Sequence, residues 1–167
     1  MDNLCYWCGV PATSSEHVPP KCIFPEKKDV DKIFNQSFRE ELITVPSCDL
    51  HNSKKSKDDE YFFVCLSSLV GNNDVALIHT YTKVWRALLH NPDLLNKVDD
   101  FIVKVKNVNF PISAIKVDLN RLRHSFEGIA RGLYYHEHSS VFIGCFNLVK
   151  LKNPPALQVV MYWRLCL

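Results

Sequence analysis

Two closely spaced pairs of metal-ligating residues constrain the fold of this chain more than any other feature. Cys5 and Cys8 are separated by two residues, and so are Cys48 and His51. Each pair can supply two ligands from one tight turn, and zinc prefers four Cys or His ligands in a tetrahedron. Gly9 directly follows the first pair, where glycine permits the turn that brings backbone amides toward the sulfur atoms. We therefore expect one structural zinc, bound by these four residues, to brace the N-terminal part of the chain.

Two alternatives to this zinc site stay open at the level of sequence. The pairs could be unrelated reduced thiols beside a surface histidine, although two pairs of equal spacing make this the weaker interpretation. Cys22 lies between the pairs and could take the fourth ligand position. The remaining cysteines lie in apolar runs and are expected to be buried thiols; they are Cys65, Cys145 and Cys166.

Composition places the chain among folded proteins and excludes several classes. Of its 167 residues, 47% are hydrophobic and 23% are charged, which excludes wholesale disorder. A net charge of +2 excludes a strongly basic protein that coats nucleic acid, so any phosphate binding must come from local geometry. No apolar run reaches the roughly 18–20 residues of a membrane span, and the first residues do not resemble a signal peptide. Because cysteines without a secretory signal favour a reducing compartment, we expect a soluble cytoplasmic protein.

The chain divides into two parts of different character, with a boundary expected near residue 70. Residues 1–57 are rich in Cys, Pro, Ser and Lys and poor in periodic segments, which indicates a loop-rich unit braced by metal. A helix is expected after an N-cap at Ser56, and Gly71 ends it. We therefore expect an α+β protein with a zinc-braced unit over 1–70 and a mixed helix-and-sheet region over 71–167.

The second part is predicted to contain helices and strands that bury an apolar face. Periodicity predicts helices over 74–89 and 120–135, with a short helix beginning at Pro92 between them. The buried positions predicted for the two long helices are Leu77, Ile78, Tyr81, Trp85, Leu88 and Leu89, and Leu122, Phe126, Ile129, Ala130 and Leu133. Four segments are predicted strands: 101–105, 112–117, 141–149 and 157–164. The last is so apolar that we expect it to be buried in the sheet or in a dimer interface, which favours a scaffold or partner-binding role.

A further set of residues lies in and after the interval between the two pairs. Glu16-His17-Val18-Pro19 lies between the pairs, and Asn52 follows His51 directly. Lys54-Lys55-Ser56 then leads into the predicted helix. In this order and spacing, residues 4–70 resemble the HNH endonucleases of the ββα-metal (His-Me finger) superfamily.

The resemblance implies a fold, an activity and a role for each of these residues. It implies a ββα-metal finger that hydrolyses phosphodiester bonds in nucleic acid, with DNA as the expected substrate. His17 would be the general base, since an imidazole can accept a proton near neutral pH. Glu16 and Asn52 would hold a catalytic Mg²⁺ or Mn²⁺, because hard divalent ions prefer oxygen ligands. The resemblance also implies that zinc only braces the fold, and that three lysines contact the phosphates: Lys21, Lys54 and Lys55.

Two other functions are compatible with the same residues. The N-terminal unit could be a zinc-braced module that binds nucleic acid or protein without hydrolysis. The chain could instead be a partner-controlled effector, for example in bacterial defence, whose C-terminal region forms a homodimer or receives a regulatory protein. Loss of cleavage in a folded His17 variant would favour the enzyme, and activity that appears only with a partner would favour the effector.

Overall fold

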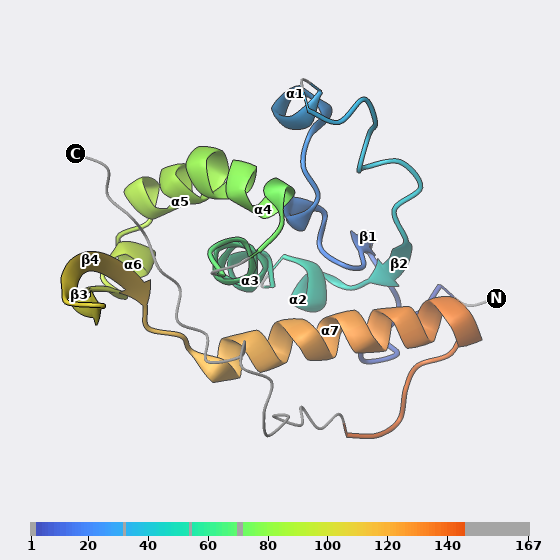
Figure 1. The fold of residues 1–167 in the computed structure, drawn as a ribbon. Helices are drawn as coiled ribbons and strands as arrows, with labels where there is room; N and C mark the ends of the chain where they lie inside the picture. Colours follow the sequence, from blue (N-terminus) through green and yellow to red (C-terminus); the bar gives the residue numbers. More distant parts are fainter. Residues whose placement is uncertain (1–2, 32, 54, 70–71, 146–167) are drawn as a thin grey trace. The chain divides into compact units, whose positions relative to one another are not determined.

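A computed structural model gives the fold of this chain and describes residues 3–31, 33–53, 55–69 and 72–145 (Figure 1). The described residues form a mixed α+β structure, which confirms the expected class at this level. The elements are, in chain order, β1 (Ser14–His17), η1 (Lys21–Ile23), α1 (Lys27–Val30), β2 (Thr44–Ser47), α2 (Asp49–Asn52), α3 (Ser56–Ser67), α4 (Asp74–His79), η2 (Thr80–Val84), α5 (Trp85–His90), α6 (Pro92–Leu95), β3 (Val98–Val105), β4 (Val108–Ile115) and α7 (Leu119–His138).

The described residues fall into two compact units. The first contains the residues up to Phe62 together with those from Leu119 onward, and the second contains Phe63–Asp118. Helix α7 therefore belongs with the N-terminal metal-ligating residues, although more than fifty residues separate it from them in the chain. The sequence-based division, with a boundary near residue 70 and 71–167 as one region, does not place α7 with the N-terminal unit.

The first unit is built around a short antiparallel strand pair. Strands β1 and β2 pair in a register that sets Ser14 opposite Ser47 and His17 opposite Thr44. Helix α2 packs against β1, and α7 packs against β2 (Figure 1). A small core lies between them and consists of Cys5, Tyr6, Val18, Val45 and Cys48, with Trp7, Ile43, Ile129 and Tyr135 packed against it.

Helix α7 approaches this core through two glycines as well as through Ile129, a member of the apolar stripe that periodicity predicts. A Cβ atom on Gly132 would lie 2.5 Å from a methyl carbon of Val18, and one on Gly128 would lie 2.9 Å from the Trp7 ring. The helix backbone itself therefore makes the contact. Phe126 and Leu133, which we expected to be buried, are each 38% exposed. Their prediction was wrong because the glycines, with no side chain, define the buried face.

In the second unit, the predicted helix over 74–89 is present but buries a different face. Its exposed side chains include Leu77, Tyr81, Trp85 and Leu89, which we had placed in the core, and Tyr81 is 76% exposed. Leu88 is buried as predicted, and the other buried residues of this helix are Ala76, His79 and Val84, which the prediction did not include. The middle of the helix, η2, is π-helical, and a wider turn changes the angle between successive side chains. A uniform 3.6-residue period therefore assigns the wrong face.

The remaining strand predictions divide into those confirmed, corrected and outside the described residues. Strands β3 and β4 confirm the two predicted near 101–105 and 112–117, and both Lys106 and Asn107 between them have positive φ, as two-residue hairpin turns require. Residues 141–145 form no strand, so that part of the predicted 141–149 strand was wrong. Residues 146–149 and the predicted strand over 157–164 lie outside the described residues.

Among the described helices, none is long and apolar enough to cross a membrane.

Candidate metal centre and the adjoining strand β1

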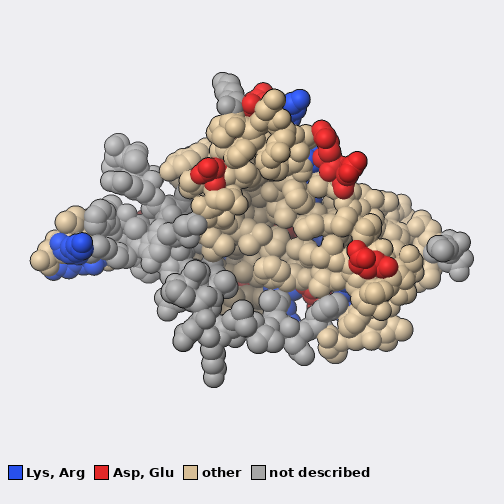
Figure 2. All heavy atoms as spheres, turned by 45° about the vertical axis from the view of Figure 1, so that its right-hand side comes forward, with Lys and Arg blue, Asp and Glu red and all other residues tan. Residues whose placement is uncertain are grey.

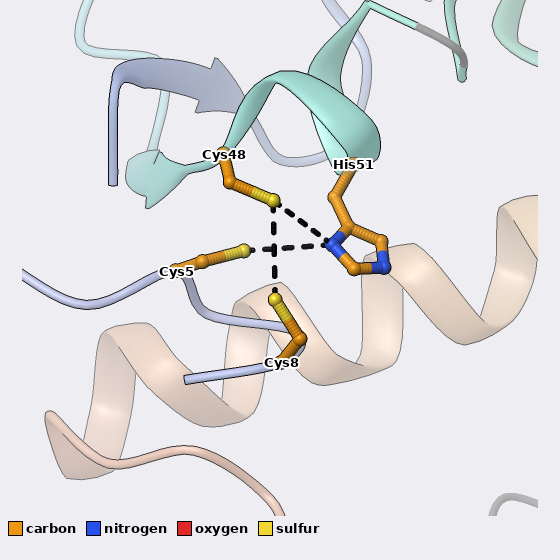
Figure 3. A group of neighbouring side chains, drawn as sticks. All are labelled: Cys5, Cys8, Cys48 and His51. Carbon is orange, nitrogen blue, oxygen red and sulfur yellow. Dashed lines mark hydrogen bonds between the residues drawn. The ribbon is translucent and has the colours of Figure 1, made fainter. Parts of the chain in front are cut away.

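The first Cys pair lies on a tight turn that precedes strand β1. The Cys5 amide donates to the Val10 carbonyl at 2.7 Å, and the Gly9 amide donates to the Cys5 carbonyl at 2.9 Å. Gly9 has φ of +74°, a conformation that costs glycine little, so its expected role in this turn agrees with the structure. The sulfur atoms of Cys5 and Cys8 both point toward the Cys48 sulfur (Figure 3).

The second pair lies where strand β2 passes into helix α2. The amides of His51 and Asn52 donate to the Cys48 carbonyl at 3.0 and 2.9 Å, which closes one helical turn after Cys48. This turn brings the Cys48 sulfur and the His51 ring to the same face of the chain (Figure 3). The two-residue spacing that the sequence shows is therefore the spacing of a local turn.

The four side chains converge with the geometry of a metal site. Their ligand atoms all lie within 4.8 Å of one another. The His51 Nδ1 atom is 3.3 Å from the Cys48 sulfur and 3.7 Å from the Cys5 sulfur, and the Cys8 and Cys48 sulfurs are 3.9 Å apart. A tetrahedron with metal–sulfur bonds of about 2.3 Å has edges of about 3.8 Å. These residues could therefore hold a metal ion, and three thiols with one imidazole are compatible with structural zinc.

Two of the pKa shifts in the cluster favour the metal-ligating form of the side chain, and one opposes it. Burial raises the pKa of the Cys5 thiol, but the backbone amides of Cys8, Cys48 and Trp7 outweigh this effect and the net pKa is lowered. Burial, followed by electrostatic interaction with His124 and Arg131, lowers the pKa of His51, which favours the neutral imidazole that a metal needs. Loss of hydration and the neighbouring sulfurs raise the pKa of Cys8. A dipositive ion would favour the thiolate form of Cys8 and offset this effect.

Glu16, the expected metal ligand on β1, lies in a buried network of its own. Its side chain forms an ion pair with Lys55, and both residues are nearly inaccessible, at 6% and 3% exposure. The other carboxylate oxygen accepts hydrogen bonds from the Tyr6 hydroxyl at 3.1 Å and the Ser47 hydroxyl at 3.4 Å. Both oxygens of Glu16 are therefore engaged by protein donors, and neither is offered to a divalent ion in this conformation.

His17 and Asn52, the other two expected catalytic residues, lie on adjoining elements. His17 is the last residue of β1 and is half-buried. Asn52 ends α2, and its side-chain nitrogen donates to the Ser14 hydroxyl at 2.9 Å and to the Ser15 carbonyl at 3.3 Å. No described residue donates to the Asn52 side-chain oxygen, which leaves this oxygen as a usable ligand. The structure thus joins Asn52 to the strand that carries His17.

The lysines expected to contact phosphate have different surroundings. Lys21 is exposed at the start of η1, Lys54 lies outside the described residues, and Lys55 is buried against Glu16. Because its ammonium group is enclosed by protein, Lys55 does not face a substrate in this conformation. Cys22 does not join the metal-ligating cluster; its thiol contacts the backbone oxygen of Asp59 at 3.5 Å.

Sequence reasoning missed the partners of Glu16. The family resemblance implies that Lys55 contacts substrate, and it gives Asp59 no role. Asp59 lies one helical turn after Lys55, and its buried Oδ1 is 3.4 Å from the Lys55 ammonium without accepting a hydrogen bond from a described residue. The i,i+4 spacing of Lys55 and Asp59 was the available signal.

Asp59 should make stability depend on pH. Burial is the main cause that raises its pKa from 3.8 to about 6, against the opposing effect of Lys55. The Asp59 carboxyl therefore binds its proton more tightly in the folded state than in the unfolded state. The protonated carboxyl favours folding at low pH, and this contribution to the free energy of unfolding is lost as the pH rises from about 4 through about 6. We expect Asp59→Asn to be more stable than wild type near pH 8 by roughly 2 kcal/mol. Urea unfolding should show this advantage shrinking toward pH 5; an advantage equal at both pH values would contradict the assignment.

The surface carries no broad basic face in the view of Figure 2. Among the described residues drawn there, acidic and basic side chains stand singly or in small groups. This agrees with the small net charge and gives no support to extensive electrostatic binding of nucleic acid on that face. Any contact with phosphate would depend on a few local groups.

Comparisons with known proteins give no match from which the kind of metal site could be inferred, so it is argued from geometry. No family model, no curated protein and no solved structure matches the chain. The fold and the cluster define a mixed α+β protein with a Cys₃His set that could hold a metal ion.

Proposed function

We propose that this chain is a zinc-braced, metal-dependent endonuclease of the HNH kind that hydrolyses phosphodiester bonds in DNA. Zinc would occupy the Cys5, Cys8, Cys48 and His51 cluster, whose four ligands leave no open position for water, so its role would be structural. The catalytic residues would lie on β1 and α2, which adjoin this cluster.

The observation that carries the proposal is the bonding of Asn52 to strand β1. Two hydrogen bonds from its side chain, to Ser14 and Ser15, join the end of α2 to the strand that ends in His17. These bonds leave the Asn52 side-chain oxygen as a ligand for a hard divalent ion. The order of a strand pair followed by a helix, with a Cys/His cluster beside it, also supports a ββα-metal finger.

In this proposal His17 takes the proton from the water that attacks the phosphodiester. A neutral imidazole is suited to this task near neutral pH, and a positioned general base contributes a factor of about 10²–10⁴ to rate. A divalent ion such as Mg²⁺ or Mn²⁺, when bound, would neutralise charge on the phosphate. Asn52 fits such an ion, whereas Glu16 does not in this conformation because Lys55, Tyr6 and Ser47 occupy its oxygens. We therefore assign Glu16 no step in the reaction.

His17→Ala should abolish cleavage without loss of the fold. We expect wild-type protein to nick or cut plasmid DNA with Mg²⁺ or Mn²⁺, and the variant to be slower by a factor of about 100 or more. The measurement is a plasmid cleavage assay at matched protein concentration, with circular dichroism as the check on folding. His136→Ala removes an exposed histidine at the end of α7 and serves as the matched control. Full activity in His17→Ala would reject His17 as the base.

A second function is favoured by the burial of Glu16. Because its carboxylate is paired with Lys55, the N-terminal unit could act as a zinc-braced module that binds nucleic acid or protein without hydrolysing it. Gel-shift measurements separate the two functions. Retention of DNA by wild-type protein, with no cleavage at any concentration of Mg²⁺ or Mn²⁺, would favour the module over the enzyme.

A further inference from the structure

Trp7, between the two cysteines of the first pair, is stacked on a ligand of the candidate zinc site. Its ring lies parallel to the His51 ring, with 9° between the planes and 5.1 Å between the centroids. His51 turns its Nδ1 toward the sulfur atoms of Cys5 and Cys48. The stack therefore covers one face of the imidazole while its edge is directed at the metal position.

The stack replaces the support that a zinc-ligating histidine usually receives. The second ring N–H of such a histidine commonly donates a hydrogen bond to a carboxylate or carbonyl oxygen, which fixes the plane of the ring. Among the described residues, the Nε2 atom of His51 has no hydrogen-bond partner. The parallel Trp7 ring is the contact that restricts rotation of the imidazole away from the cluster.

Helix α7 also contacts Trp7. The His124 ring lies 4.9 Å from the Trp7 ring, and the Arg131 guanidinium lies 5.6 Å from its centroid. Gly128, between these two residues on the helix, lets the backbone approach so closely that a Cβ there would lie 2.9 Å from Trp7. In Figure 3 the helix passes behind the four ligands. Trp7 thus contacts both a candidate metal ligand and helix α7.

Arg131 is itself held in place by several partners. It forms an ion pair with Glu127 at 2.8 Å, and its guanidinium donates to the carbonyl oxygens of Phe142 and Gly144 at 3.0 and 3.1 Å. Its side chain is only 12% exposed. A guanidinium fixed in this way presents a stable face to the indole, and such cation–π contacts strengthen as water is excluded.

From these contacts we propose that α7 is a clasp that retains the zinc, with Trp7 as the positioning residue that transmits its hold to His51. His124 and Arg131 hold the Trp7 ring in place, and Trp7 keeps His51 in the ligating position. Zinc loss begins when one ligand swings away, so the clasp acts mainly on the rate of release. This inference rests on zinc occupying the four-ligand cluster, and it does not depend on nuclease activity.

The test measures the rate at which zinc leaves the full-length protein in excess chelating dye. We expect Trp7→Ala, His124→Ala and Arg131→Met to release zinc faster than wild type. For Trp7→Ala the expected factor is about ten, because residues that contact a metal ligand commonly change metal affinity by 10- to 100-fold. Trp7→Phe keeps a flat ring and should release zinc nearly as slowly as wild type. Circular dichroism establishes that each variant is folded, and His124→Ala, at an exposed position, keeps the test valid if Trp7→Ala does not fold.

Arg121→Met is the matched control for a general loosening of α7. Arg121 also fastens this helix, through an ion pair with Asp58 at 2.7 Å and a cation–π contact with Tyr61, but it does not contact Trp7. We expect its zinc release to match wild type. Equal acceleration by Arg121→Met and Arg131→Met would overturn the clasp, as would wild-type release from both Trp7→Ala and His124→Ala. Wild-type protein that binds no zinc, or no Co²⁺ with a thiolate absorption band, would reject the metal centre itself.

Discussion

Replacing Cys48 with alanine should abolish metal binding and unfold the N-terminal unit. Cys48 contributes one of four ligands and is also part of the small core with Cys5, Tyr6 and Val18. Structural zinc contributes roughly 10–16 kcal/mol of apparent binding free energy in small zinc units, and that energy is available only to the folded state. Strands β1 and β2 have four residues each, so the hydrophobic core around them is too small to compensate for such a loss.

Three measurements on Cys48→Ala test this expectation. Metal analysis should fall from about one zinc per chain to none, the circular dichroism spectrum should lose helix and strand signal, and limited proteolysis should cut within residues 1–62. Cys22→Ala is the matched control, because it removes a largely buried thiol that lies outside the cluster. A soluble, folded Cys48→Ala protein without zinc would show that the metal is dispensable. If Cys22→Ala loses zinc instead, Cys22 is the fourth zinc ligand.

The candidate metal centre could be predicted from the sequence because its geometry is local. Two intervening residues fit one turn of backbone, so the spacing of Cys5 and Cys8, or of Cys48 and His51, fixes where each pair of side chains points. The helix over 56–67 and the two strands β3 and β4 were likewise recoverable from the local sequence pattern, although their pairing as a hairpin was not predicted. In each case the determining interactions lie within a few residues of one another.

The features that could not be predicted depend on contacts between distant residues. The pairing of Glu16 with Lys55 spans 39 positions, and lysine in a charged run ordinarily indicates a solvated face. Helix α7 contacts Trp7 across more than a hundred residues, through glycines that a hydrophobicity pattern ignores. The buried face of the 74–89 helix was missed for a different reason, since a π-helical turn interrupts the period on which the pattern relies. No local signal in this sequence marks that turn.

Lys55→Met should destabilise the folded protein more than any other single substitution outside the metal ligands. The Lys55 ammonium lies between the carboxylates of Glu16 and Asp59, and the side chains of Lys55 and Glu16 are 2% and 7% exposed. Removing it leaves Glu16 as a buried negative charge with only the Tyr6 and Ser47 hydroxyls as donors. Breaking a buried ion pair in this way costs about 3–5 kcal/mol. Urea unfolding at neutral pH measures the loss.

The double variant distinguishes an unpaired charge from a simple loss of packing. The double variant Glu16→Gln/Lys55→Met removes both charges. Replacing a buried ion pair by uncharged groups often changes stability little. We therefore expect the free energy of unfolding of the double variant to exceed that of Lys55→Met alone by about 2 kcal/mol or more. Lys57→Met, two positions along at an exposed site, should change stability by no more than about 0.5 kcal/mol. If the stability changes of Glu16→Gln alone and Lys55→Met alone add up to that of the double variant, Glu16 and Lys55 do not stabilise each other. In that case Glu16 would be free to leave Lys55, and its assignment as a ligand of a catalytic ion would regain support. Strong coupling would instead make Glu16 the anchor that holds β1, and with it His17, against the start of α3.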